Sequence, residues 1–249
     1  MIDLLSLESY CNELLKVDEF NDYCPNGLQV EAGQQVEKLM LGVTACQALI
    51  EAAEDWEADA LLVHHGYFWK GEGLPLRGLK AKRVGALFRQ RTALLAYHLP
   101  LDAHAEYGNN RQLGEKLDLT PADPLSDGSL IWHTTLSDPV SAKALAQRIG
   151  DRLDRRPTHI APDDKPLSRI GWCTGAAQGS IEEAAEQGLD AYISGEISEQ
   201  TVHLARELGI HYYAAGHHAT ERYGVQALGR HLAERFSLEY RFVDVENPV

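Results

Sequence analysis

Short apolar runs alternate with amphipathic segments along most of the chain. The runs are rich in Leu, Val and Ala and predict buried strands, while the amphipathic segments place their apolar side chains at helical spacing. In the first half, strands are predicted at 39–45, 58–65 and 92–99, and helices at 3–16, 47–56, 79–91 and 109–119. Pro25-Asn26-Gly27 predicts a turn that leads into an extended segment. This alternation favours a largely parallel sheet covered on both faces.

A segment rich in Pro, Asp, Ser and Gly interrupts the alternation at 120–128 and predicts a domain boundary. Beyond it, strands are predicted at 129–136, 168–175, 189–196, 210–216 and 238–245, a short extended segment at 156–162, and helices at 141–153, 180–188, 198–209 and 217–236. Ser141 is a plausible N-cap for the first of these helices. We therefore expect one lobe from residues 1–126 with about 217–249, and a second lobe from about 127–216.

The chain carries a weak internal repeat. Segments 43–66 and 173–196 both predict a strand, a turn of small residues, a helix, an acidic turn and a strand, and AAEDWEADA aligns with AAEQGLDA. Chance similarity of two βαβ units and duplication of an α/β half both explain this; duplication predicts that strand ends of both halves face a shared cleft. The expected fold class is α/β, with two interlinked lobes and mainly parallel sheets.

Composition narrows the class of protein. A net charge of −14 argues against broad nucleic-acid binding, which needs clustered Lys and Arg. The four cysteines are far apart and form no CxxC, so reduced thiols are expected. The acidic, amphipathic N-terminus lacks the basic region of a signal peptide, and no apolar run approaches the roughly 18 residues of a membrane span. We expect a soluble cytoplasmic protein that makes no membrane contact.

Histidines and carboxylates lie at the ends of three predicted strands. His64 and His65 end the strand 58–65, Asp102 lies in HLPLDAH (98–104) after the strand 92–99, and His217 and Glu221 lie in AAGHHATER (214–222) after the strand 210–216. Taken one at a time, each segment has an ordinary structural explanation. His64 and His65 could be core histidines, Asp102 could be a turn residue, and His217 with Glu221 could be a surface pair. Ligands collect at strand ends in α/β proteins, and neutral imidazole is a common metal ligand. Their recurrence in one chain favours a single metal site assembled from distant segments.

Strand geometry bears on how many ions this site holds. Neighbours in a strand point to opposite faces, so His64 and His65 can face one ion only if the strand ends there, which Gly66 permits. Pro100 is expected to bias Leu99 to extended geometry and so to aim Asp102. The donor set has no thiolate and comprises His64, His65, Asp102, His217 and Glu221. It suits two divalent ions of Zn, Fe, Mn, Ni or Co, with a bridging hydroxide as a hydrolytic nucleophile.

These motifs, taken together, resemble a known family over nearly the whole chain. The motifs are PNGLQVEAG (25–33), GVTACQALIEAA (42–53), ALLVHHGYFWKG (60–71), HLPLDAH, CTGAAQ (173–178), ISGEISEQTVHLARE (193–207) and AAGHHATER. The chain resembles the YbgI branch of the GTP cyclohydrolase type 2 family, whose eukaryotic relatives are the NGG-interacting-factor-like proteins. The resemblance implies a toroidal homohexamer, a trimer of dimers, with a dinuclear centre held by the same five residues. It also implies Glu221 as the bridging ligand and His98 as a supporting or proton-transfer group.

Three functions are compatible with this site. The first is a metal-dependent hydrolase acting on a nucleotide or purine-like substrate; because the chain has no GxxxxGK[ST] motif, phosphate would bind through the metals or basic residues such as Lys70. Oxidase chemistry at a di-iron centre is a variant of it. The second is a metal-binding or metal-delivery protein without turnover. The third is a hexameric scaffold in which the metals are structural.

Overall fold

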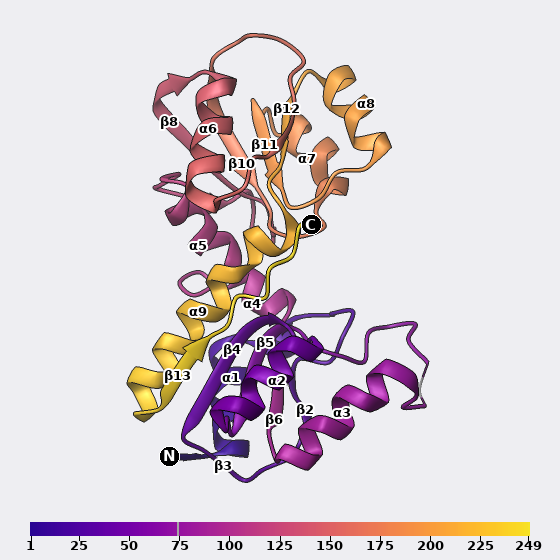
Figure 1. Cartoon of the computed structure of the whole chain (residues 1–249). Coiled ribbons are helices and arrows are strands. Elements are labelled where there is room, and N and C mark those ends of the chain that lie inside the picture. The colour runs from indigo at the N-terminus through magenta and orange to yellow at the C-terminus, as the bar shows by residue number, and fades with distance from the viewer. Residues whose placement is uncertain (74) are drawn as a thin grey trace. The chain divides into compact units, whose positions relative to one another are not determined.

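The computed structural model describes residues 1–73 and 75–249, which form two compact units (Figure 1). The first unit comprises residues 1–108 and 224–246, and the second comprises 109–223 and 247–249. Each unit has a central sheet with helices on both faces. The α/β class with parallel strands at the centre of each sheet is confirmed.

The first unit contains a five-stranded sheet in the order β13-β4-β5-β6-β2. Its strands are β2 (Gly27–Val30), β4 (Lys38–Thr44), β5 (Ala60–His65), β6 (Ala93–Ala96) and β13 (Glu239–Phe242), of which β2 alone among these five runs antiparallel to its neighbour. Its helices are α1 (Leu4–Leu14), η1 (Val17–Glu19), α2 (Gln47–Trp56), α3 (Gly78–Gln90) and α4 (Leu99–Ala103). A small two-stranded sheet pairs β1 (Ile2–Asp3) with β3 (Gln35–Val36).

The packing of alternate residues of β5 explains why this strand is apolar from Ala60 to Val63. Leu62 packs in a core with Leu4 of α1 and Leu228 of helix α9 (His217–Phe236). Leu61 and Val63 pack on the opposite face, in the core formed with α2 and α3. Since both faces are buried, residues 60–63 lack the alternating polar positions of a strand in a half-exposed sheet.

The second unit contains a six-stranded sheet in the order β7-β8-β10-β11-β12-β9. The three central strands β10 (Leu167–Trp172), β11 (Ala191–Ser194) and β12 (His211–Ala214) are parallel, and β7 (Asp123–Pro124), β8 (Trp132–Val140) and β9 (Thr158–Ile160) pair antiparallel to their neighbours. Its helices are α5 (Asn109–Lys116), α6 (Ala142–Leu153), η2 (Gln178–Ser180), α7 (Ile181–Glu186), α8 (Glu199–Leu208) and the first turns of α9. The predicted N-cap is confirmed, because Ala144 N donates to Ser141 Oγ at 3.1 Å.

The internal repeat corresponds to two equivalent βαβ units, β4-α2-β5 and β10-α7-β11, each with parallel strands. In each unit, an aspartate at the matching position joins the two strands by hydrogen bonds to backbone amides. Asp59 Oδ2 accepts hydrogen bonds from the backbone amides of Glu37 and Lys38 at 2.9 and 2.8 Å. Asp190 Oδ2 accepts from the amides of Ser168 and Arg169, both at 2.8 Å. The acidic turn that aligned in the two sequence segments thus performs the same structural role in both units.

The division between the units differs from the boundaries at 126 and about 217 drawn from composition. Helix α5 belongs to the second unit, because Leu113 packs in the core around Trp172 and the Trp172 indole donates to the Asn110 carbonyl at 2.8 Å. The first turns of α9 belong there too, since Thr220 Oγ1 accepts from Gly175 N at 3.1 Å. The segment 120–128 therefore lies inside the second unit, where it contains the short edge strand β7.

The geometry expected around Pro100 is also corrected. Strand β6 ends at Ala96, and Leu99 begins the short helix α4 instead of extending the chain. Proline is tolerated in a first helical turn, where its missing N–H would have no helical partner. The Leu99 N–H is held by Asp22 Oδ2 at 2.9 Å, which stabilises this helix start. In the part of the chain that the structure describes, no helix is long and apolar enough to cross a membrane.

Candidate metal-binding residues

His64 and His65 end strand β5 and lie side by side in the first unit. Their ring centroids are 4.6 Å apart and their planes are inclined at 44°. The strict divergence of strand neighbours is relaxed because β5 ends at His65, as Gly66 permitted. Gly66 is itself required, since a Cβ there would overlap the Gln29 side chain and Ala96. The strand end therefore presents both imidazoles to one region.

The orientation of the His64 ring is fixed by the backbone that follows β6. Its Nδ1 lies 2.8 Å from the Tyr97 carbonyl oxygen, and since a carbonyl only accepts, Nδ1 carries the proton. Its Nε2 lies 3.4 Å from Asp102 Oδ1, and both side chains are buried. If the ring is neutral, the lone pair of Nε2 faces a lone pair of the Asp102 carboxylate, which is unfavourable. A cation, either a proton or a metal ion, satisfies this arrangement.

His65 and His98 complete a histidine cluster in the first unit. The Thr44 hydroxyl lies 3.2 Å from His65 Nδ1. One ring nitrogen from each of His64, His65 and His98 lies within 4.8 Å of the others, so these residues can hold a metal ion. His98, for which proton transfer was expected, is thus placed directly beside the two predicted ligands.

A carboxylate that sequence reasoning missed holds His98. Asp22 Oδ1 lies 2.7 Å from His98 Nδ1. Burial alone would raise the pKa of Asp22, but hydrogen bonds from His98, Asn26 and the Tyr23 amide lower it to about 2. The neighbouring Cys24 also lies close enough to share a metal group with Asp22 and His98, yet burial and then the charge of Asp22 raise the pKa of its thiol to about 12. Asp22 therefore acts as an anionic partner of His98, and Cys24 as a neutral thiol.

His217 and Glu221 lie one turn apart at the start of α9, in the second unit. Their Nε2 and Oε2 atoms are 3.0 Å apart, which confirms the i, i+4 pairing expected from the sequence. His217 Nδ1 lies 2.7 Å from Glu196 Oε1. Burial lowers the pKa of His217, but the hydrogen bonds and charges of Glu221 and Glu196 outweigh it and raise the pKa to about 9. A metal ion bound at Nε2 would therefore have to displace the proton that His217 carries there at neutral pH.

Two residues that sequence reasoning missed shape the surroundings of His217 and Glu221. Glu196 follows β11 and orients His217, as carboxylates orient metal-binding histidines. Gly175 has φ +67°, and a Cβ there would overlap Glu221 Oε1 and lie 3.2 Å from His217 Nε2. The signal that finds Glu196 is the repeat: when Asp59 is matched with Asp190, His65 at the end of β5 corresponds to Glu196 just after β11.

The equivalence of the two units also relates the His98–Asp102 and His217–Glu221 pairs. In the first unit, His98 and Asp102 are four residues apart at the start of the helix after β6. In the second unit, His217 and Glu221 are four residues apart at the start of the helix after β12. The structure thus separates the predicted set into His64, His65, His98 and Asp102 on one unit and His217 and Glu221 on the other, at matching ends of their sheets. The predicted lobe of residues 1–126 and about 217–249 would have contained all five predicted ligands, whereas the unit boundaries in the structure divide them.

Replacing Glu196 with Gln should weaken metal binding by the His217–Glu221 pair roughly 10- to 100-fold, the usual cost of losing a carboxylate behind a ligating histidine. The amide keeps the size but loses the charge that fixes the Nδ1 proton of His217. Competition with a chromogenic chelator measures the affinity. Glu199→Gln, on the exposed side of α8, is the matched control and should bind metal as the wild type does. Equal affinities of all three proteins would remove Glu196 from the site.

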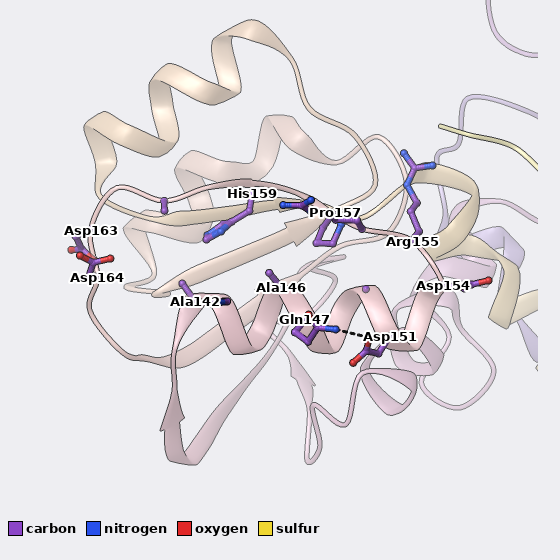
Figure 2. Close-up of a pocket in the computed structure, with 14 residues that line it drawn as sticks. Ala142, Ala146, Gln147, Asp151, Asp154, Arg155, Pro157, His159, Asp163 and Asp164 are labelled. Carbon is purple, nitrogen blue, oxygen red and sulfur yellow. Dashed lines mark hydrogen bonds between the residues drawn. The ribbon is translucent and has the colours of Figure 1, made fainter.

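The second unit also has a groove between α6 and the edge strand β9, with a volume of about 880 Å³ (Figure 2). His159 lines it, and its Nε2 lies 3.1 Å from Nδ1 of the buried His211. His211 Nε2 in turn lies 3.3 Å from Asp163 Oδ1. The residues that line this groove include none of the predicted metal ligands.

Comparison with known proteins supports these assignments of fold and family. The family model "Duf34/NIF3 (NGG1p interacting factor 3)" matches residues 2–248. A protein of Allochromatium vinosum named "GTP cyclohydrolase 1 type 2 homolog" is 51% identical over 250 residues, covering 100% of this chain and 98% of the relative. A Vibrio cholerae protein of the same name is also 51% identical, covering 98% of this chain and 99% of the relative.

Solved structures of similar sequence have the same fold. The structure of protein ybgI, described as of unknown function, is 45% identical, with a TM-score of 0.96 and full coverage of both chains. A protein from Thermus thermophilus is 31% identical, with a TM-score of 0.92 and full coverage of both chains. These comparisons confirm that the chain resembles the YbgI branch, as its sequence motifs indicated.

Proposed function

Because the chain belongs to the Duf34/NIF3 family, we propose that it is a dinuclear metal protein that hydrolyses a nucleotide or other purine-like substrate. On this proposal, the protein holds two divalent ions of Zn, Fe, Mn, Ni or Co. The ligands are His64, His65, Asp102, His217 and Glu221, with Glu221 as the bridging carboxylate.

One observation carries the proposal: in each unit, an imidazole is fixed through Nδ1 while its Nε2 faces a buried carboxylate. In the first unit His64 stands between the Tyr97 carbonyl and Asp102. In the second, His217 stands between Glu196 and Glu221. Imidazole nitrogens paired with carboxylate oxygens are the donors that borderline divalent ions prefer. The donor set therefore supports the metal centre that the family resemblance implies.

The bound metals would supply an activated water as the nucleophile. The protein's own residues have separate tasks. Asp22 holds the His98 imidazole through Nδ1, so that Nε2 is available to take a proton from, or give one to, the reacting groups. The low pKa of Asp22 keeps it anionic across the neutral range, which favours a stable orientation of the ring. The name shared by the relatives supports a purine nucleotide as the substrate class.

The test begins with elemental analysis of protein purified without added metal, followed by turnover of GTP and a panel of nucleotides by the metal-loaded protein. We expect about two divalent ions per chain. Glu221→Gln should lose more than the roughly 10- to 100-fold in rate that changes behind a ligand cause. Glu234→Gln, exposed on the same helix, is the control. Equal trace rates for wild type and Glu221→Gln would reject hydrolysis, and metal retained without turnover would leave a metal-binding or metal-delivery protein.

We also propose assembly as a homohexamer, a trimer of dimers, which the motif resemblance implies. The native mass of the metal-loaded protein measures this directly, and any mass other than that of six chains would exclude it. Stripping the metals then separates the roles, because a ring that survives chelation does not need the metals for its assembly.

A further inference from the structure

Two aromatic side chains, the partly buried Trp69 and the exposed Tyr23, lie beside the histidine cluster of the first unit. The Trp69 ring lies 4.9 Å from that of His98, nearly perpendicular at 84°, and 6.0 Å from that of His65. The Tyr23 ring lies 6.5 Å from His98, inclined at 61°. Tyr23 is 61% exposed, so the hydrophobic core does not account for it.

The loops that carry these side chains are tied to each other and to the sheet. Lys70 N donates to the Tyr23 carbonyl at 2.6 Å, and Tyr67 N donates to Gln29 Oε1 at 2.6 Å. The Trp69 indole N–H donates to the Gly66 carbonyl at 3.2 Å. These bonds fix the backbone of both loops and the edge of the indole.

The backbone immediately before Trp69 is strained, so the position of the Trp69 side chain is maintained at a cost in conformational energy. Phe68 has φ +65°, a conformation that is rare for a bulky residue. Its N–H donates to Glu72 Oε2 at 3.1 Å, which holds the turn. Strained residues cluster at ligand sites, where the surrounding structure maintains them. Here the strained residue immediately precedes the aromatic side chain that contacts His98.

We propose that Tyr23 and Trp69 form a stacking site for the planar ring of the substrate, next to His98 and His65. This inference rests on the proposed function, and it specifies a planar heteroaromatic ring with an anionic substituent. Stacking on aromatic faces tolerates different rings and contributes about 1–3 kcal/mol per base. Lys70 follows Trp69 and is exposed, so its ammonium group is available to the anionic substituent.

The experiment compares binding of guanosine 5′-monophosphate, which has a planar ring, with ribose 5-phosphate, which lacks one. Calorimetry on the full-length protein, metal-loaded and metal-stripped, gives both affinities. We expect the wild type to prefer the ring-bearing probe, and Trp69→Leu or Tyr23→Leu to weaken its binding roughly 5- to 100-fold, with ribose 5-phosphate unaffected. Trp69→Tyr should restore most of the preference. Phe88→Leu, an exposed aromatic on α3, is the control.

Metal content, measured on the same samples, separates this inference from the proposed function. A ring preference that depends on Trp69 supports stacking even if the protein holds no metal or shows no turnover. Equal affinity for both probes, no binding of either, or a preference that survives Trp69→Leu and Tyr23→Leu would overturn the stacking site while leaving metal binding and hydrolysis to be judged by their own test.

Discussion

Replacing Gly175 with Ala should abolish metal binding by the His217–Glu221 pair while leaving the first unit's histidines in place. The added Cβ would overlap Glu221 Oε1 and lie 3.2 Å from His217 Nε2, so the carboxylate must leave its position. The backbone is strained as well, because Gly175 has φ +67°, where Ala costs about 1–2 kcal/mol. We expect the loss of affinity to exceed the roughly 100-fold upper value for changes behind a ligand.

Chelator competition measures the affinity, and urea denaturation measures the free energy of unfolding. Gly179→Ala is the matched control, since a Cβ at Gly179, four residues away, would meet nothing within 4 Å. It should match the wild type in metal binding. If Gly175→Ala also binds metal as tightly as the wild type, metal binding does not require the Glu221 carboxylate in the position that it has here, because the carboxylate cannot stay there beside a Cβ. A variant that is destabilised but keeps its metal affinity would have the same meaning.

The sequence was sufficient where the fold depends on local pattern. Apolar runs buried on both faces identified the central strands, and the helices between them followed from spacing, as with α2, which has the predicted bounds 47–56. The pairing of His217 with Glu221 was predictable for the same reason, since a helix places residues four apart on one face. Parallel strands also bring their carboxyl ends to one edge, which explains why His64 and Asp102 come close.

The parts that could not be predicted depend on contacts between distant residues. Asp22 lies 76 residues before His98, in a segment with no periodicity that would relate them. The same carboxylate holds the Leu99 amide and so turns the chain after β6 into a helix, which overrides the extended bias expected before Pro100. The boundary between the units depends on the packing of α5 against Trp172, which is a contact between distant residues and could not be predicted. The composition of segment 120–128 carries no information on that packing.

Single substitutions of the paired histidines should each remove one ion. If two ions are bound with one β5 histidine each, His65→Ala should hold about one divalent ion per chain where the wild type holds about two. His64→Ala should do the same, with an added loss of stability, because it leaves the buried Asp102 carboxylate facing a cavity. Elemental analysis after extensive dialysis gives the stoichiometry.

Two further variants make this result interpretable. His203→Ala, exposed on α8, should keep both ions and controls for nonspecific binding by histidine. His98→Ala should also keep both ions if this residue transfers protons, yet lose activity, whereas a drop in metal content would make it a third ligand of the β5 cluster. Because the ring nitrogens of His64, His65 and His98 lie within 4.8 Å of one another, a single ion shared by the three is the competing arrangement. In that case each of the three substitutions would lower the occupancy of the same ion, and none would leave the protein with half of its metal.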